Sequence, residues 1–169
     1  MDMNSETTIG RTTHGNLQKH QNANPFQKRL IDKFHLKIRA LIRETAVTRL
    51  LDAGCGEGFG LNHLLTDGLE VDYVGCDLSF PALQWGKENV LPDLTAVNTD
   101  IHHLPFPDNA FPLVMCLEVL EHIPDSAVGL RELARVSSEY IVVSVQHEPF
   151  FRGANFMRGK HWNRWGNDP

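Results

Sequence analysis

The chain has 169 residues, a formal net charge of −5 and a hydrophobic fraction of 41%. This length is sufficient for one domain with a buried core. The acidic balance argues against binding to nucleic acid or to an anionic membrane surface. The sequence contains no signal-peptide pattern and no run of about 18 apolar residues, so it predicts no insertion into a membrane.

Three cysteines occur in the sequence, and they lie far apart. Because Cys55, Cys76 and Cys116 form no C-x-x-C pair, neither a zinc site nor a disulfide framework is predicted. We expect small, buried and reduced side chains near the ends of strands. Free thiols of this kind favour a cytoplasmic location.

The composition divides the chain into three parts. Residues 1–24 are polar, show no apolar period and are expected to be disordered or to lie on the surface. Residues 25–146 carry the apolar patterns of a folded domain. Residues 147–169 mix basic and aromatic side chains. Such a tail either lies partly covered on the surface or binds a nucleic acid or nucleotide-linked substrate, of which we favour the first.

The folded part is predicted to begin with a helix. Pro25 suits the first helical turn, with Asn24 as the N-cap. An apolar face is predicted from residues at helical spacing, which are Phe26, Leu30, Ile31, Phe34, Ile38, Leu41 and Ile42. Lysines and arginines fill other positions. We expect this helix to cover a sheet; the alternative is that its basic face guides a substrate or closes the site.

Strands and helices are predicted to alternate after this helix. The expected strands are 47–53, 71–76, 94–98, 111–117 and 140–145. The expected helices are 57–66, a segment from a Ser79 cap to residue 89, and 125–136. This alternation predicts an α/β fold with a doubly wound, Rossmann-like parallel sheet and helices on both faces. The last strand is a continuous β-branched run, so we expect it to be buried on both faces.

Polar and small residues follow the predicted strands. They are Gly54 and Gly56, then Asp77, Asp100, Glu118 and His147, after strands one to five in turn. Ligands of doubly wound sheets bind at the carboxyl edge, close to the point where the strand order reverses. The sequence therefore predicts a ligand site at this edge.

Residues 50–60, LLDAGCGEGFG, connect the first of these strands to a helix. Glycines stand at positions 54, 56, 58 and 60, where they allow positive φ and close approach of a ligand. The dinucleotide spacing G-x-G-x-x-G fails in both registers, because Phe59 and Leu61 stand where the third small residue is needed. No lysine follows as a P-loop requires. An NAD-type oxidoreductase is therefore disfavoured.

The segment 51–58, LDAGCGEG, resembles motif I of the class I S-adenosylmethionine (SAM)-dependent methyltransferases, including those of ubiquinone biosynthesis. The resemblance extends from about residue 24 to the end and is strongest over residues 50–145. It implies an enzyme that moves a methyl group from SAM to an O, N or C atom of a small-molecule acceptor. The alternative is a SAM-binding module without catalysis.

The resemblance also implies a set of cofactor-binding residues. Asp77 would accept hydrogen bonds from both ribose hydroxyls. Asp100 would accept one from the adenine amine, while Ile101 packs on the ring. Asp52 would orient the glycine turn or reach the methionine amine. The full set is Asp52, Ala53, Gly54, Cys55, Gly56, Gly58, Asp77, Leu78, Asp100, Ile101 and Leu117.

Two features around the fourth strand need separate interpretation. Pro112 stands where the family usually has Asp, and a proline there must mark the first residue of the strand or a bulge. The run 118–122, EVLEH, is common in the family; Glu118, Glu121 and His122 could hold a divalent cation, but we predict no metal. His122 is the one candidate for a catalytic base or substrate contact, and the alternative is a structural histidine.

The family fold has seven strands, and five are predicted here. Either the chain is C-terminally truncated relative to the family, or its fifth strand is left less protected. An exposed edge and an uncovered apolar face favour association, so a homodimer is an expectation.

Overall fold

The computed structural model describes residues 25–145. The expectations for residues 1–24 and 147–169, His147 among them, lie outside the described residues. The helices and strands follow one another in this order: α2 (Pro25–Thr45), β1 (Arg49–Ala53), α3 (Phe59–Thr66), β2 (Asp72–Asp77), α4 (Phe80–Asn89), β3 (Thr95–Asn98), β4 (Phe111–Leu117), the 3-10 turn η1 (Leu120–His122), α5 (Ser126–Val136) and β5 (Ser137–Ser144).

The five described strands form one parallel sheet in the order β3-β2-β1-β4-β5. Leu51 pairs with Val74 of β2 on one side and with Val114 of β4 on the other. The chain moves outward from β1 to β3 and then returns to β4, so the strand order reverses between β1 and β4. This arrangement confirms the predicted doubly wound sheet and places the ligand edge at the carboxyl ends of β1 and β4.

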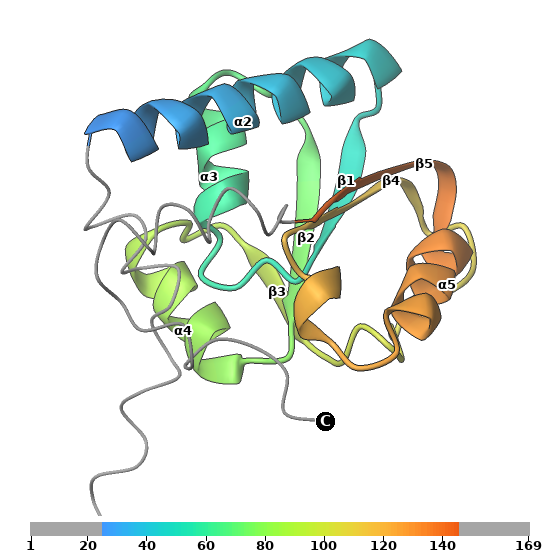
Figure 1. Ribbon diagram of the computed structural model, residues 1–169. Coiled ribbons are helices and arrows are strands. Elements are labelled where there is room, and N and C mark those ends of the chain that lie inside the picture. Colours follow the sequence, from blue (N-terminus) through green and yellow to red (C-terminus); the bar gives the residue numbers. More distant parts are fainter. Residues whose placement is uncertain (1–24, 146–169) are drawn as a thin grey trace, which may run out of the picture.

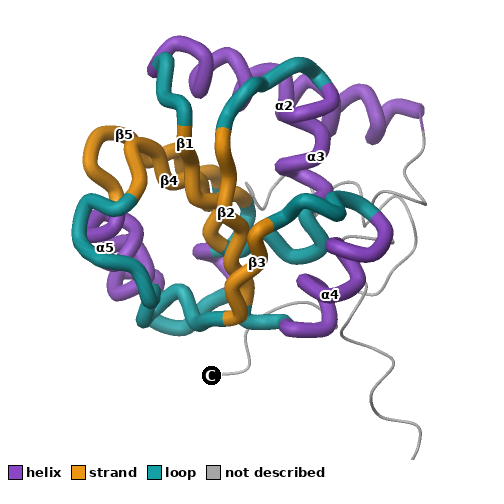
Figure 2. The backbone as a smooth tube through the Cα atoms, turned by 180° about the vertical axis from the view of Figure 1, so that it is seen from behind, coloured by secondary structure: helices purple, strands orange, loops and turns teal. Residues whose placement is uncertain are grey.

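Helices cover both faces of the sheet, as Figure 1 and the reverse view in Figure 2 show. Leu50 and Met115 face a core that also contains Ile42 of α2, Leu61 of α3 and Leu83 of α4. Adjacent strand residues belong to a second core on the opposite face, and this core includes Leu51, Val114, Leu133 and Val136. Successive residues of a strand point to opposite faces, so β4, which is covered on both faces, is apolar throughout.

The ends of several helices carry capping residues. The Ser79 hydroxyl accepts a hydrogen bond from the Ala82 amide at 3.3 Å, and Pro81 lies in the first turn of α4, as predicted. Gly68 follows α3 with φ of 84°, a left-handed conformation that glycine adopts without strain. Asp125 caps α5 in the same way as Ser79 caps α4.

Pro112 interrupts the pairing of β4 with β5. The register shifts between Phe111 and Leu113, because a proline has no amide hydrogen to donate to the neighbouring strand. The expectation of a bulge or a strand start is confirmed, since Phe111 is the first residue of β4 and Pro112 lies within the shift.

The expectation that strand five is buried on both faces is wrong for the described residues. Tyr140, Ile141 and Val143 are 42%, 40% and 39% exposed. β5 lies at the edge of the described sheet and pairs with β4 alone. A β-branched run predicts a strand reliably, but it cannot show how many neighbours the strand has.

The predicted apolar face of α2 is also only partly correct. Ile38 and Ile42 are buried, whereas Phe26, Leu30 and Leu41 are 65%, 43% and 50% exposed. His35 is buried instead, and its ring stacks on His63 of α3 with 4.7 Å between the ring centroids. The helix therefore meets the domain along a narrower stripe than helical spacing alone predicts, and that stripe includes a histidine.

The three cysteines are free and buried, as expected. Cys55 follows β1, Cys76 lies near the end of β2 and Cys116 lies near the end of β4. Burial raises the pKa of the Cys76 and Cys116 thiols to about 12. Among the helices of residues 25–145, none is long and apolar enough to cross a membrane.

Candidate functional site

The turn after β1 is shaped by glycines in left-handed conformations. Gly54 has φ of 83°, and a Cβ added there would lie 2.4 Å from Val119 Cγ2. Both the backbone angle and the close contact therefore require glycine. The amides of Gly54 and Cys55 donate to the Cys76 carbonyl at 2.7 and 3.0 Å, which attaches the turn to the end of β2.

Asp77 ends β2 and joins two backbone segments. Its carboxylate accepts a hydrogen bond from the Gly56 amide at 2.8 Å and another from the Ser79 amide at 2.8 Å. These contacts fix the carboxylate between the glycine turn and the start of α4. Each carboxylate oxygen accepts more than one hydrogen bond, so Asp77 keeps capacity for a ligand.

Asp52 lies beneath this turn and is 5% exposed. Burial, and secondarily the charge of Asp77, raise its pKa from 3.8 to about 7. Within residues 25–145 no hydrogen bond reaches its carboxyl group. A cationic ligand group nearby would favour the ionised form, because an opposite charge lowers the pKa of a carboxyl group.

Asp100 follows β3, at the next strand along the edge. Its Oδ1 accepts a hydrogen bond from the His102 amide at 2.9 Å and is 2.6 Å from the ring atom Nδ1 of His102. These hydrogen bonds, the backbone one foremost, lower the pKa of Asp100. The carboxylate is therefore ionised at neutral pH.

These segments enclose a cleft of about 180 Å³ at the carboxyl edge. It is lined by Gly54, Cys76, Asp77, Leu78, Thr99, Asp100, Ile101, Val119 and Ile123. The structure thus brings together five of the residues expected to bind a cofactor, namely Gly54, Asp77, Leu78, Asp100 and Ile101. Leu78 is 72% exposed, which is a large apolar exposure for a residue beside a cleft.

The other expected cofactor residues do not line this cleft. Asp52 and Ala53 are buried in β1, and Gly56 and Gly58 are buried in the turn. Cys55 is also buried, with its Sγ 2.8 Å from the position of a Cβ added to Gly75. Leu117 is the last residue of β4 and does not line the cleft. These residues shape or support the turn rather than form the surface of the cleft.

Four residues that line the cleft were not predicted: Cys76, Thr99, Val119 and Ile123. Cys76 and Thr99 are neighbours of predicted residues, and their position at strand ends is a signal that the sequence contains. Val119 and Ile123 come from the segment after β4, and only the spatial neighbourhood of β1 and β4 identifies them.

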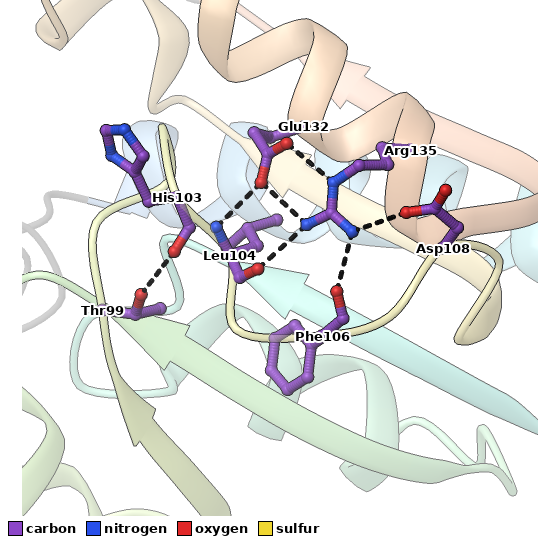
Figure 3. A network of polar contacts seen from close by, with 7 residues as sticks. All are labelled: Thr99, His103, Leu104, Phe106, Asp108, Glu132 and Arg135. Atoms are coloured by element: carbon purple, nitrogen blue, oxygen red, sulfur yellow. Dashed lines mark hydrogen bonds and ion pairs between the residues drawn. The ribbon is translucent and has the colours of Figure 1, made fainter.

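Figure 3 shows how the loop after β3 is attached to α5. The Arg135 guanidinium donates to the carbonyls of Leu104 and Phe106 at 2.9 and 2.8 Å and to Asp108 at 2.9 Å. Glu132 accepts from Arg135 and also from the Leu104 amide at 2.9 Å. The hydrogen bond from Arg135 is the main cause that lowers the pKa of Glu132 to about 2. We name residues 99–108 the β3 loop.

The segment after β4 carries the candidate for catalysis. Glu118 has φ of 56°, an uncommon conformation for a non-glycine residue, and its amide donates to the Ser144 carbonyl at 2.9 Å. His122 ends η1, is exposed and does not line the cleft. In residues 25–145 no three His, Cys, Asp or Glu side chains are grouped so that they could hold a metal ion.

Residues 51–139 match the family described as a methyltransferase domain, and this span is more than half of the chain. The chain belongs to the class I SAM-dependent methyltransferase family. The domain is similar to 2-methyl-6-phytyl-1,4-hydroquinone methyltransferase of Synechocystis, with 36% identity over 91 residues, which are 53% of this chain and 28% of that protein. It is 30% identical to ubiquinone biosynthesis O-methyltransferase of Escherichia fergusonii over 118 residues, which are 68% of this chain and 45% of that protein.

Solved structures support the fold of this methyltransferase domain. The sugar N-methyltransferase of a Streptoalloteichus species is similar with a TM-score of 0.66 and 19% identity, covering 89% of this chain and 61% of that one. Magnesium protoporphyrin IX methyltransferase of Synechocystis, solved with bound SAM, is similar with a TM-score of 0.59 and 19% identity, covering 81% and 74%. The chain spans between 28% and 45% of the length of the two curated relatives above.

Proposed function

We propose that this chain binds SAM in the cleft at the carboxyl edge and transfers its methyl group to an O, N or C atom of a small-molecule acceptor. The observation that carries the proposal is that two carboxylates, Asp77 and Asp100, line one cleft together with Gly54 of the glycine turn. They lie at the carboxyl ends of neighbouring strands, β2 and β3, and provide acceptors for a ligand that has both hydroxyl and amine donors.

The residues present fit the cofactor. Asp77 supplies acceptor oxygens for the ribose hydroxyls, and Asp100 supplies an acceptor for the adenine amine. Ile101, Val119 and Ile123 provide the apolar surface that an adenine ring needs. Asp52 is buried in β1, two residues before Gly54, and in its ionised form would favour a cationic group such as the methionine end of SAM nearby.

SAM supplies a reactive sulfonium methyl group when it is bound, so the protein needs little catalytic apparatus of its own. The task of these residues is to bind the cofactor, to orient it and to hold the acceptor in line with the methyl group. A base is required only where the acceptor loses a proton, and His122 is our candidate for that base. The proposal includes no metal ion.

The acceptor is proposed to be a small molecule. The similar proteins are named as methyltransferases of a hydroquinone, of ubiquinone biosynthesis and of a sugar. Acceptor contacts of such enzymes lie in variable loops, so these names define a class and no single compound. The rival reading is a SAM-binding module without catalysis.

We further propose that the protein acts in the cytoplasm and forms a homodimer. Three buried free thiols are compatible with a reducing compartment. The exposed apolar residues of β5, together with its unpaired edge in the described sheet, support association of two copies. Sedimentation of the wild-type chain and of Ile141→Lys tests the dimer; a monomer at all concentrations would contradict it.

Calorimetric titration of the purified chain with SAM, and in parallel with NAD⁺, tests the proposed function. We expect micromolar binding of SAM alone. Asp77→Asn should weaken SAM about tenfold, because a hydrogen bond to a charged group is lost. Asp93→Asn, an exposed carboxylate outside the cleft lining, is the matched control and should leave affinity unchanged.

Absence of SAM binding, or binding of NAD⁺ in its place, would overturn the proposal. Incubation with SAM labelled at the methyl group and a pool of cellular metabolites then distinguishes the enzyme from the binding module. Transfer of the label to a small molecule supports the enzyme, and binding without transfer to any fraction supports the module.

A further inference from the structure

His102 joins two segments that line the proposed cofactor cleft. Its ring atom Nδ1 is 2.6 Å from Asp100 Oδ1, and its other ring nitrogen, Nε2, is 2.6 Å from the carbonyl oxygen of Pro124. Asp100 belongs to the β3 loop, whereas Pro124 directly follows Ile123, which also lines the cleft. One side chain thus connects the two segments, and its contact with Pro124 spans 22 positions of the chain.

Both neighbours of this ring are acceptors, which restricts its protonation state. A carboxylate oxygen and a backbone carbonyl oxygen cannot donate a hydrogen bond. A neutral imidazole has one N–H and satisfies one of them, whereas an imidazolium has two and satisfies both. The side chain is 14% exposed, and both of its ring nitrogens lie within hydrogen-bond distance of these acceptors.

The charges around the ring support the imidazolium. The hydrogen bond to Asp100 is the main cause that raises the pKa of His102, and the carbonyl of Pro124 adds to it. The other titratable side chains of the two segments are His103 and Asp108 on the β3 loop and Glu118, Glu121, His122 and Asp125 after β4.

We propose that His102 is a positioning residue of the cofactor cleft, joining the Asp100 carboxylate to the Pro124 carbonyl when it is doubly protonated. The inference rests on the proposed function, because the ligand positioned in this way is the adenine end of SAM. His102 occupies Oδ1 of Asp100 twice, through its amide and its ring. Oδ2 receives no hydrogen bond from residues 25–145 and is left for the amine of the ligand.

The sign of the pH dependence follows from the raised pKa. The connection is complete below the ordinary pKa of histidine, about 6.5, and is lost as pH rises through the higher pKa of the folded state. Loss of the second N–H frees either the carboxylate or the Pro124 segment. Affinity for the adenine end should therefore decrease as His102 deprotonates.

The affinity test compares SAM binding by the wild type and by His102→Gln at several pH values between about 6 and 9. The ratio of the two dissociation constants cancels the ionisation of SAM itself and of Asp52. We expect the variant to bind about fivefold more weakly near pH 6 and almost as well as the wild type near pH 9. His103→Gln makes the same change one residue along, on an exposed ring, and should give a ratio near one throughout.

A second measurement keeps the inference separate from the proposed function. Long-range nitrogen–proton NMR correlations of the ligand-free chain report whether both ring nitrogens of His102 carry protons near neutral pH. We expect both to be protonated in the wild type, and the pKa to decrease in Asp100→Asn. Doubly protonated His102 without SAM binding would overturn the proposed function and leave the connection standing. A neutral ring, or a pH-independent ratio of affinities, would overturn the inference.

Discussion

The glycine turn and the β3 loop both line the cleft, but they are held in place by different kinds of contact. Around the glycine turn, amides of Gly54 and Cys55 bind a backbone carbonyl, and Asp77 receives two further amides. The β3 loop, in contrast, is held by the side chains of Arg135, Glu132 and His102. Apart from the Asp77 carboxylate, the first arrangement depends on backbone shape and tolerates few substitutions, whereas the second depends on several ionisable side chains and responds to pH.

The largest expected effect comes from the glycine turn. Gly54→Ala should lower the free energy of unfolding by about 2–4 kcal/mol and abolish SAM binding, because the positive φ and the contact with Val119 both oppose a Cβ. Gly60→Ala, at a position within α3, is the control. The added Cβ would lie 3.7 Å from His35 Nε2 of α2, which is an ordinary contact distance.

Urea unfolding of both variants and of Gly54→Ala/Val119→Ala checks this prediction. The added truncation should restore the part of the stability that the steric contact costs and leave the part due to φ. Equal stability of Gly54→Ala and Gly60→Ala would show that the turn is not as constrained as its geometry indicates.

Asp52→Asn is expected to have the next largest effect. At pH 8 it should increase the free energy of unfolding and decrease the affinity for SAM. The folded state favours protonated Asp52, so ionisation destabilises it as pH rises from about 3.8 to about 7. The variant should be more stable than the wild type by about 1–3 kcal/mol at pH 8 and equal near pH 4. SAM affinity at pH 8 should fall. A stability difference that is the same at both pH values would refute the assignment.

On the β3-loop side, Glu132→Gln should lower the free energy of unfolding by about 1–2 kcal/mol at pH 7. Its pKa is lowered from 4.5 to about 2, so the contribution is present above about pH 4.5 and is lost as pH falls towards 2. Unfolding curves of wild type and variant should therefore converge in acid. Glu139→Gln, an exposed carboxylate on β5 without a hydrogen bond among the described residues, should change little at any pH.

The smallest expected effect is at the cap of α4. Ser79→Ala removes the hydroxyl that accepts the Ala82 amide and should cost about 1 kcal/mol. The Ser79 amide still donates to Asp77, so SAM affinity should be nearly unchanged. Thermal unfolding measures the change in stability, and calorimetric titration measures the change in SAM affinity. A large loss of affinity would mean that the hydroxyl also contacts the ligand.

The elements that the sequence predicts well are those whose signal is local. Strand 111–117 has the predicted bounds, and Ser79 and Pro81 begin α4 as expected. β5 begins at Ser137, three residues before the predicted start, because pairing with Phe111 extends the strand through residues of low β-propensity. Tertiary pairing decides such boundaries.

The candidate site also contains residues with a local sequence signal and contacts that depend on tertiary packing. Asp77 and Asp100 were predicted from strand ends and from the resemblance, and the structure places both at one cleft. The contacts of Arg135 with Leu104 and of His102 with Pro124 span 31 and 22 residues. No spacing in the sequence indicates these pairs, because they depend on how α5 and the segment after β4 pack against the β3 loop.

The three buried cysteines also provide probes of local opening of the structure. Each thiol reacts with an alkylating reagent only when its part of the sheet opens, so its labelling rate reports the frequency of that opening. Cys55, Cys76 and Cys116 sample three adjacent places, the turn after β1 and the ends of β2 and β4. The wild-type chain can be alkylated with and without a ligand and then analysed by mass spectrometry. A slower labelling of one cysteine would show that the bound ligand closes that part of the carboxyl edge.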